Sequence, residues 1–300
     1  MVEDLFNMQS MMILMVVCGN ILGKKKLISK EGQKSCTELL LKVVLPCNIL
    51  LAYLKADRSM LTQLFPIFLF SLFFHILATI LSRILYNNIP DSKRSSLMYA
   101  TIISNGGLLG NSVIDNLYGA KGLLYASIHL IPLRIFMWTF GLACFVRINK
   151  KNVLKTFFTN PCICAVLIGL IMMFCNITFP YFIEKTITAF SNCLTPITML
   201  LIGVILSNIS LKNIFSKGSF FISAIRLLIL PSLCLLLCNL LNLDPFSTKI
   251  STLIIAMPAA STTALLAAKY GKDEIFATKC VSLTTLLSMI TIPFWGYILS

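Results

Sequence analysis

Long runs of apolar residues, separated by short polar connections, recur along the whole chain. Each run holds about twenty residues, the length at which an α-helix crosses a hydrocarbon layer roughly 30 Å thick with its backbone hydrogen bonds closed internally. The connections between the runs are too short to fold as a soluble domain. The pattern predicts ten membrane-spanning helices, over residues 5–23, 36–54, 61–83, 95–119, 122–146, 161–178, 183–207, 218–241, 248–269 and 274–299.

The composition of the 300 residues agrees with this pattern. Hydrophobic residues make up 57% of the chain and charged residues 12%, and the mean hydropathy is +0.89. A single water-soluble core cannot bury so much apolar surface, so much of that surface must face lipid. We therefore expect an all-α polytopic membrane protein.

The first apolar run lies at the N-terminus, where a signal peptide would also lie. Glu3 and Asp4 precede the run, and Lys24, Lys25 and Lys26 follow it. A cleavable signal has the opposite order, with basic residues before its apolar region. The run is therefore predicted to be a transmembrane helix whose N-terminus lies outside.

Basic residues are distributed unequally between alternate connections. The odd-numbered connections hold sixteen: Lys24, Lys25, Lys26, Lys30, Lys34, Arg83, Lys93, Arg94, Arg147, Lys150, Lys151, Lys155, Lys212, Lys217, Lys269 and Lys272. The even-numbered connections hold five: Lys55, Arg58, Lys121, Lys185 and Lys249. Because cytoplasmic loops carry an excess of Lys and Arg, the asymmetry predicts a multi-pass protein of the cytoplasmic (plasma) membrane with both termini outside.

The net charge of +14 has the same origin. Strongly basic proteins often bind nucleic acid, but these charges lie in short connections beside apolar spans, where they set topology and contact anionic lipid. We expect membrane lipids, and no nucleic acid, as partners. The eleven cysteines lie mostly within spans, and Cys162 and Cys164 have no matching His or Cys ligands nearby, so we expect no metal site and no cofactor.

Several landmarks recur at a separation of about half the chain. Pro46 and Pro196 lie 150 residues apart, and the two Tyr-Gly pairs that end at Gly119 and Gly271 lie 152 residues apart. Because five helices carry the chain to the opposite side of the membrane, a second group of five enters inverted relative to the first. The predicted organisation is one integral membrane unit of two five-helix inverted repeats, residues 1–150 and 151–300.

The fourth and ninth predicted spans contain residues that interrupt a helix. The fourth has Asn105, Gly106 and Gly107, followed by Asn111, a composition that disfavours a continuous helix. The ninth has Pro258, which cannot donate a backbone hydrogen bond. Either feature alone is common in membrane helices as a kink or a packing site.

Breaks at corresponding positions of both halves indicate a transport site. A broken helix at membrane depth is tolerated where it lines a cavity, and the N-terminus of the following half-helix presents N–H groups suited to an anion. The break in the ninth span also has hydroxyl side chains beside it. We therefore predict substrate contacts at Asn105, Gly106, Gly107, Asn111, Pro258, Ser261 and Thr262.

Three stretches taken together resemble a known family: residues 104–119, residues 134–141, with the sequence Arg-Ile-Phe-Met-Trp-Thr-Phe-Gly, and residues 256–271, which begin Ala-Met-Pro. In order and spacing, over essentially the full chain, they resemble the auxin efflux carrier family, which includes bacterial malate permeases and plant auxin exporters. The resemblance implies a ten-helix fold of two five-helix inverted repeats, crossed broken helices at the fourth and ninth spans, and transport of organic anions. It also implies an elevator-like motion, with the first, second, sixth and seventh spans as scaffold.

Individual positions match the pattern of this family in part. Asn105 corresponds to the family's crossover asparagine, and Pro258 to the crossover proline of the ninth span. Ser112 stands where a proline is usual, Thr262 where bacterial members often have asparagine, and Arg134 where many members have an uncharged polar residue. The departures indicate a subgroup with an anion of its own.

Arg134 lies near the middle of the fifth predicted span. A cation at that depth costs about 2.5–3.5 kcal/mol or more, so it needs a partner or a wet cavity. The partner is either the substrate or Asp115, which is also the candidate site for coupling to H+ or Na+. For Lys42 and Arg226 we favour snorkelling along their apolar stems over a functional contact.

The predicted function is secondary transport of a small organic anion, a mono- or dicarboxylate such as malate, by alternating access. A membrane enzyme would need paired carboxylates or a histidine-rich metal cluster, which eleven acids mostly in loops and two distant histidines do not supply. A receptor or scaffold would not explain two matched breaks. A channel is a less favoured alternative, because the sequence has no repeated filter-like element. The nearest alternative is a sodium-coupled anion symporter of the related bile-acid-transporter type. The exact substrate, the transport direction, the coupling ion and a homodimer all remain open.

Overall fold

The computed structural model describes residues 2–54, 61–146, 161–175, 177, 179–207 and 214–299. In this part of the chain, the residues form helices joined by short connections, with one isolated antiparallel β-bridge between Ser104 and Ala259. Six helical stretches are long and apolar enough to cross a membrane: Glu31–Leu54, Leu64–Leu85, Gly106–Gly141, Tyr181–Ser207, Lys217–Leu240 and Glu274–Ile298. The all-α membrane class is thus confirmed.

Helices also occupy the remaining predicted spans. Two shorter apolar stretches are Ser10–Lys24, which is the end of a helix that begins at Val2, and Pro161–Cys175, and the ninth predicted span is divided into two helices. The ten-span count, the inverted repeat and the outside termini therefore stay predictions. Some basic residues used for the orientation lie outside the described residues: Lys55, Arg58, Arg147, Lys150, Lys151, Lys155 and Lys212.

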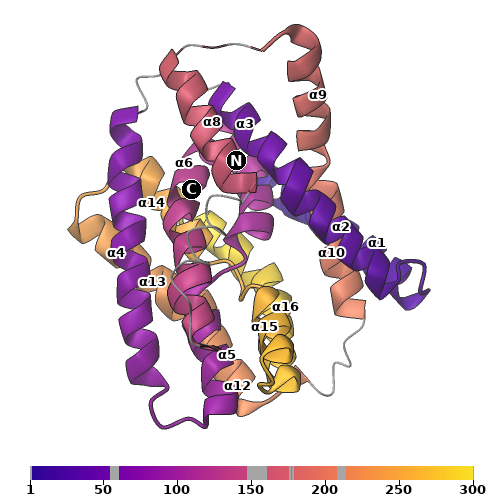
Figure 1. The fold of residues 1–300 in the computed structure, drawn as a ribbon, viewed down its shortest axis with the longest axis vertical. Coiled ribbons are helices and arrows are strands. Elements are labelled where there is room, and N and C mark those ends of the chain that lie inside the picture. Colours follow the sequence, from indigo (N-terminus) through magenta and orange to yellow (C-terminus); the bar gives the residue numbers. More distant parts are fainter. Residues whose placement is uncertain are drawn as a thin grey trace. The chain divides into compact units, whose positions relative to one another are not determined.

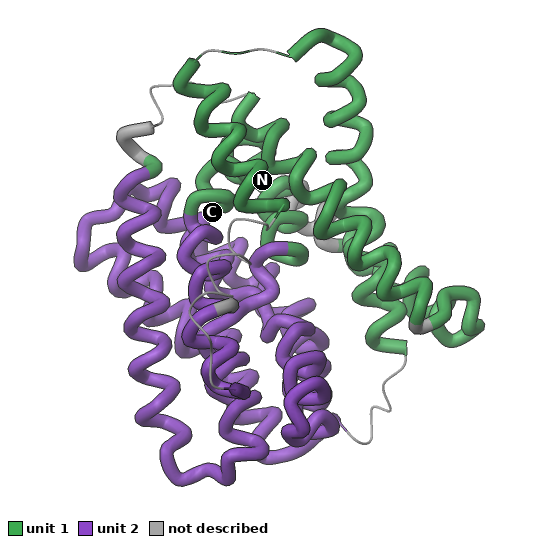
Figure 2. The backbone as a smooth tube through the Cα atoms, viewed as in Figure 1, with its two compact units in different colours: residues 1–64, 108–128, 158–209 green, residues 65–107, 129–157, 210–300 purple. Residues whose placement is uncertain are grey.

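The helices gather into two compact units (Figure 2). Unit 1 comprises residues 1–64, 108–128 and 158–209, and unit 2 comprises residues 65–107, 129–157 and 210–300. Each unit takes segments from both halves of the chain. The compact units therefore differ from the predicted repeats, residues 1–150 and 151–300, which remain a description of sequence symmetry.

Unit 1 is built from helices of the first, second, sixth and seventh predicted spans, together with the end of the fourth and the start of the fifth. Its elements are α1 (Val2–Lys24), α2 (Lys30–Leu39), the π-helical turn η1 (Leu40–Val44), α3 (Leu45–Leu54), the first part of α6 (Asn111–Phe136), α8 (Pro161–Cys175), α9 (Tyr181–Asn192) and α10 (Leu194–Ser207). Figure 1 shows α1 beside α10 and α3 beside α8, and α3 also contacts α9.

Glycines bring α1 and α10 unusually close. A Cβ atom on Gly19 would lie 2.1 Å from the carbonyl oxygen of Leu200, and one on Gly203 would lie 2.0 Å from the carbonyl oxygen of Val16. Small residues permit such backbone contact between membrane helices, where apolar side chains gain little by leaving lipid. The α1–α10 pair therefore depends on glycine at both positions.

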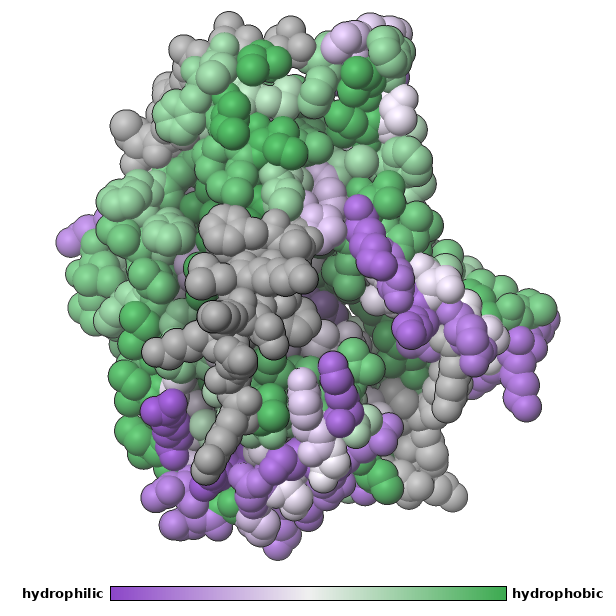
Figure 3. All heavy atoms as spheres, viewed as in Figure 1, coloured by the Kyte–Doolittle hydropathy of each residue, from purple (hydrophilic) through white to green (hydrophobic). Residues whose placement is uncertain are grey.

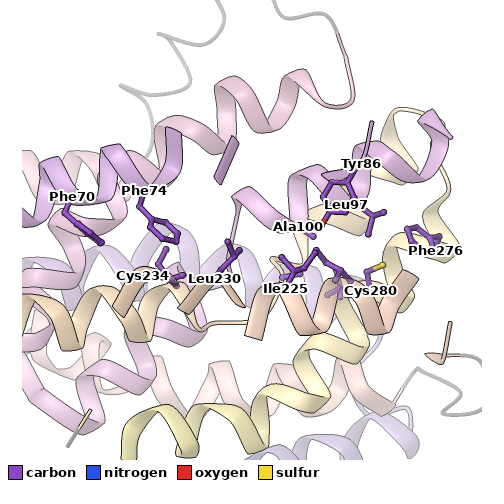
Figure 4. Packing of buried hydrophobic residues seen from close by; sticks show 14 of the residues in the cluster. Phe70, Phe74, Tyr86, Leu97, Ala100, Ile225, Leu230, Cys234, Phe276 and Cys280 are labelled. Carbon is purple, nitrogen blue, oxygen red and sulfur yellow. The ribbon is translucent and has the colours of Figure 1, made fainter. Parts of the chain in front are cut away.

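Unit 2 contains the remaining helices. They are α4 (Leu61–Leu85), α5 (Asp91–Ile102), the second part of α6, the π-helical turn η4 (Met137–Gly141), α12 (Lys217–Ala224), the π-helical turn η5 (Ile225–Ile229), α13 (Leu230–Leu240), α14 (Pro245–Ile255), α15 (Thr262–Lys269) and α16 (Glu274–Ile298). Their apolar core brings Phe74 of α4, Leu97 of α5, Leu230 of α13 and Cys280 of α16 into one cluster (Figure 4). This cluster holds α4, α5, α13 and α16 together.

Helix α4 illustrates how unit 2 meets lipid. Its large apolar side chains Phe65, Leu69 and Phe73 recur every four residues on one face and are exposed, whereas Ser71 and His75 are buried on another. Figure 3 shows hydrophobic surface over much of this helix, with hydrophilic residues gathered near the ends of α5, α12 and α15. An apolar exterior around buried polar groups is expected when the surrounding solvent is lipid.

Two prolines and two glycines lie at local irregularities of the helices. Pro46 and Pro231 each come shortly after a π-helical turn. In both places the N–H of the residue before the proline donates to the carbonyl oxygen five residues earlier, because proline cannot continue the regular ladder of helical hydrogen bonds. Gly119 and Gly271 adopt φ values of +58° and +64°, a left-handed conformation that glycine adopts readily. Both glycines therefore stand where a residue with a side chain would be strained.

Candidate functional site

Helices α5 and α14 both end inside unit 2, and two extended segments follow them. The N–H of Asn105 donates to the carbonyl oxygen of Pro258 at 2.8 Å, and the N–H of Ala260 donates to that of Ile103 at 3.4 Å. These bonds flank the bridge between Ser104 and Ala259. We call residues 103–107 and 257–261 the crossover. Its backbone groups satisfy one another where the helical ladders stop, as buried backbone requires.

The sequence favours this crossing at two positions. Gly106 lies so close to its neighbours that a Cβ atom would meet Ile254 Cγ2 at 2.9 Å and Leu130 Cδ2 at 3.0 Å. Pro258 has no N–H to leave unpaired, while its carbonyl accepts from Asn105. The predicted breaks in the fourth and ninth spans are therefore confirmed as the place where α5 and α14 end.

Hydrogen bonds of polar side chains join the crossover to the surrounding helices. The Ser104 hydroxyl donates to the carbonyl oxygen of Ile254 at 3.2 Å, at the end of α14. The N–H of Ala259 donates to Thr284 Oγ1 of α16 at 3.3 Å. The hydroxyls of Tyr99 and Thr262 lie 2.9 Å apart, which joins α5 to the start of α15. The crossover is thus held from three sides by neutral hydrogen bonds.

The positively charged side chain of Arg226 donates hydrogen bonds at the crossover. Its Nε donates to the carbonyl oxygen of Met257 at 3.0 Å, and its Nη1 donates to that of Thr101 at 2.9 Å. The side chain is only 1% exposed, so the expectation that Arg226 snorkels is wrong. The physical reason is that carbonyl groups at two helix ends compete successfully with the membrane surface for the guanidinium. Lys42, by contrast, is exposed and pairs with Glu38 at 2.8 Å.

Most of the predicted substrate residues belong to unit 2. Asn105, Gly106, Gly107 and Pro258 form part of the crossover, and Ser261 and Thr262 begin α15. The side chain of Ser261 is exposed and makes no capping hydrogen bond to α15. The first N–H groups of a helix have no intrahelical partner and carry partial positive charge. The crossover residues are thus brought together beside the start of a half-helix.

Arg134 also belongs to unit 2, in the second part of α6. It is only 6% exposed, and neither Nη1 nor Nη2 has a hydrogen-bond partner among the residues that the structure describes. A buried guanidinium without partners is costly, since each lost bond to a charged group leaves the full desolvation penalty. The two nitrogens therefore have the capacity to bind an anion.

Asn111 and Asp115 belong to unit 1. Asn111 is fully buried, and neither atom of its amide has a partner in the described part of the chain. Asp115 Oδ2 accepts from Asn48 Nδ2 at 3.3 Å, and the same Nδ2 donates to Ser191 Oγ at 2.9 Å. Asp115 thus shares the Asn48 amide with Ser191, and its predicted pairing with Arg134 stays an untested alternative.

Sequence reasoning missed Arg226, Thr101, Tyr99 and Thr284 as parts of the crossover. Arg226 had a usable signal, because it lies well inside the eighth predicted span, over residues 218–241. A cation at that depth reaches neither surface easily. The other three give no such signal, because Thr and Tyr occur throughout the chain.

Comparison with known proteins gives one family and several full-length relatives. A family described as "Membrane transport protein" matches residues 8–156 and again residues 143–296. The chain is similar to the uncharacterized transporter MJ1031 of Methanocaldococcus jannaschii, with 24% identity over 96% of both chains. It is also similar to an uncharacterized transporter of Methanothermobacter thermautotrophicus, at 25% over 96% of both, and to the uncharacterized transporter YfdV of Escherichia coli, at 20% over 95% of both.

Proposed function

The chain belongs to the auxin efflux carrier family of membrane transport proteins, and from this we propose that it carries a small organic anion by secondary transport. The substrate class is a mono- or dicarboxylate such as malate, and the site of action is the cytoplasmic membrane. The relatives are named only as transporters, so the substrate class rests on the chemistry of the chain itself.

The observation that carries the proposal of an anion is the state of Arg134. Its two terminal nitrogens are buried and unpartnered within the described residues. A carboxylate matches the planar fork of a guanidinium with two parallel hydrogen bonds, and such charge-assisted bonds are about twice as strong as neutral ones. A bound carboxylate would therefore supply the partners that Arg134 lacks.

The crossover offers a second set of contacts for the same anion. Asn105 and Thr262 supply side-chain polar groups, and the half-helix that begins near Ser261 supplies N–H groups with partial positive charge. A monocarboxylate would occupy one of the two cationic positions. A dicarboxylate would use both the half-helix N-terminus and Arg134, and we favour it for that reason.

An elevator-like motion is proposed as the transport mechanism. Support comes from the division of the helices: unit 1 gathers α1, α3, α8, α9 and α10, which represent the first, second, sixth and seventh predicted spans. These spans form the scaffold in the family resemblance. Residues 108–128 also cluster with unit 1, so the boundary between scaffold and moving part would cross the helix α6.

Coupling to H+ or Na+ is proposed at Asp115. This carboxylate lies within a predicted span and accepts a hydrogen bond from Asn48, and an ionisable group at membrane depth is a common element of proton or ion pathways. A sodium-coupled symporter remains the second candidate function. It differs from a proton-coupled carrier or a uniporter in requiring sodium for uptake.

A substrate screen in proteoliposomes tests the proposal. Purified protein would be reconstituted and supplied with labelled mono- and dicarboxylates, with and without proton and sodium gradients. Asn105→Leu is expected to abolish uptake, because it removes the crossover amide while keeping the backbone N–H that bonds Pro258. Asn88→Leu, an exposed position between α4 and α5, serves as the matched control. Absence of uptake for every carboxylate, or normal uptake by Asn105→Leu, would contradict the proposal.

A further inference from the structure

Arg226 connects the ends of both broken helices in unit 2. It lies in the π-helical turn η5, and it donates to Met257 and Thr101 at 3.0 Å and 2.9 Å. Thr101 belongs to the last turn of α5, and Met257 lies two residues beyond the end of α14. One side chain from a third helix therefore bonds to carbonyl groups at two helix C-termini.

The two helix ends present negative charge to Arg226. A helix C-terminus carries about half a negative elementary charge, and its last carbonyl groups have no partner within the helix. Inside a membrane-spanning protein, lipid cannot solvate these groups. Carriers with broken helices use such ends to coordinate Na+ or H+. Here a guanidinium from the chain itself binds them.

Arg226 is compensated by these helix ends rather than by an acid. None of the ion pairs between described residues includes it. Its remaining nitrogen, Nη2, has no hydrogen-bond partner in the described part of the chain. The hydroxyl of Tyr86 bonds the hydroxyl of Thr101 at 2.8 Å, which fixes the residue whose carbonyl Arg226 binds. The positive charge of Arg226 is therefore balanced by the partial negative charge of the carbonyl groups that it binds at the crossover.

We propose that Arg226 is a fixed internal cation of the crossover, which takes the position that a coupling ion takes in other carriers with broken helices, so that the crossover binds no sodium. A sodium ion at the carbonyl groups of Met257 and Thr101 would lie beside an unneutralised positive charge and would compete for oxygen atoms already in use. This role of Arg226 in stability does not depend on the proposed function.

Thermal unfolding of the purified full-length protein tests the crossover without any substrate. Asp115→Asn, which removes the other candidate site for sodium, is expected to have the same Tm in sodium chloride and in choline chloride at equal ionic strength. A rise in the Tm of this variant that is specific to sodium would overturn the proposal, because it would mean that a sodium site persists beside Arg226.

Chemical rescue distinguishes a fixed cation from simple packing. Arg226→Ala is expected to lower the Tm, and guanidinium chloride at concentrations well below denaturation is expected to raise it again, relative to choline chloride. Arg83→Ala, which removes an exposed arginine near the end of α4, is the matched control and should show no such rise. An identical response of both variants to guanidinium would overturn the proposal.

A conservative variant covers the case in which Arg226→Ala does not fold. Arg226→Lys keeps the positive charge and loses one of the two directed bonds, so it should unfold at a lower temperature than wild type. A Tm of Arg226→Lys equal to that of wild type would contradict the role of the guanidinium.

Discussion

The two units satisfy charged side chains in different ways. In unit 1, the partly buried carboxylate of Asp115 accepts from the side-chain amide of Asn48, and the helices α6 and α3 continue past the contact. In unit 2, the buried guanidinium of Arg226 donates to the backbone carbonyls of Thr101 and Met257, where α5 and α14 end. In unit 1 a continuous pair of helices satisfies the charge through a side chain, whereas in unit 2 the broken helices provide an opposite partial charge.

The difference has consequences for stability. Removing Asn48 would leave two side chains of unit 1, Asp115 and Ser191, with fewer partners but would spare the helical backbone. Removing Arg226 would leave carbonyl groups of two helices unpaired at once. The crossover of unit 2 is therefore expected to be the more sensitive region.

Arg226→Met should have the largest effect. It keeps an unbranched side chain but leaves two buried carbonyl groups unpaired, which is expected to cost about 2–6 kcal/mol of unfolding free energy, from about 1–3 for each group. Thermal or denaturant unfolding in detergent would measure the change. Arg83→Met, at an exposed position, should stay within about 0.5 kcal/mol of wild type. Equal losses of unfolding free energy in both variants would mean that the crossover is no more sensitive than an exposed position of the same unit.

Asn48→Leu should come next. The substitution removes the amide that donates to both Asp115 and Ser191, and it is expected to cost about 1–3 kcal/mol. In the double variant with Asp115→Asn, the two effects should not be additive, because the residues are in contact. Unfolding measurements on both single variants and the double variant form the cycle. Strict additivity would show that the Asn48–Asp115 contact contributes nothing.

Thr284→Val should produce a smaller change in the crossover. It removes the acceptor of the Ala259 N–H, at a cost of about 0.5–1.5 kcal/mol, while keeping the shape of the side chain. The neighbouring Thr285 is a close control, because its hydroxyl donates to the carbonyl of Val281 within the same helix. Thr285→Val should therefore be nearly neutral. A larger loss in Thr285→Val would contradict the assignment of Thr284 to the crossover.

The ion pair between Asp91 and Lys272 should matter least. The hydrogen bond from Lys272 lowers the pKa of Asp91 below its usual value of 3.8, with a smaller contribution from the charge of Arg94. The pair therefore stabilises the fold above that pH and loses its effect as the pH falls through the lowered pKa. Because Asp91 is largely exposed, Asp91→Asn should cost less than about 1 kcal/mol at pH 7.

The same variant should approach wild type as the pH falls. Unfolding of both proteins would be followed between neutral and acidic pH, at low and at high salt. High salt should reduce the difference at neutral pH, since it screens exposed charges. A difference that grows toward acidic pH would have the wrong sign for a carboxylate with a lowered pKa.

The sequence alone predicted the membrane class and the positions of both helix breaks. Runs of about twenty apolar residues report directly on the thickness of a bilayer, and this signal does not depend on tertiary contacts. Gly106 and Pro258 restrict the backbone locally, so their effect could also be read from residue type. These predictions succeeded because each depends on local sequence and residue type rather than on tertiary contacts.

The partners of the buried charges could not be predicted in the same way. Arg226 bonds to backbone carbonyls 31 and 125 residues away in the sequence, and every residue has a carbonyl. The composition of α5 and α14 therefore gave no sign that their ends would bind a cation. Similarly, the contact of Asn48 with Asp115 joins residues 67 positions apart. Such contacts follow from the packing of the helices rather than from local sequence.

The central claim is that this carrier binds an organic anion through Arg134, and transport by Arg134→Gln tests it most directly. Uptake of labelled malate and of a labelled monocarboxylate would be measured in proteoliposomes for wild type, Arg134→Gln and the exposed control Arg83→Gln. The account predicts that Arg134→Gln weakens malate uptake by about tenfold or more, the loss of a charge-assisted bond worth roughly 1.5–3 kcal/mol, while sparing the monocarboxylate. Equal losses for both substrates, rescued when Asp115 is also changed to Asn, would contradict it and assign Arg134 to structure.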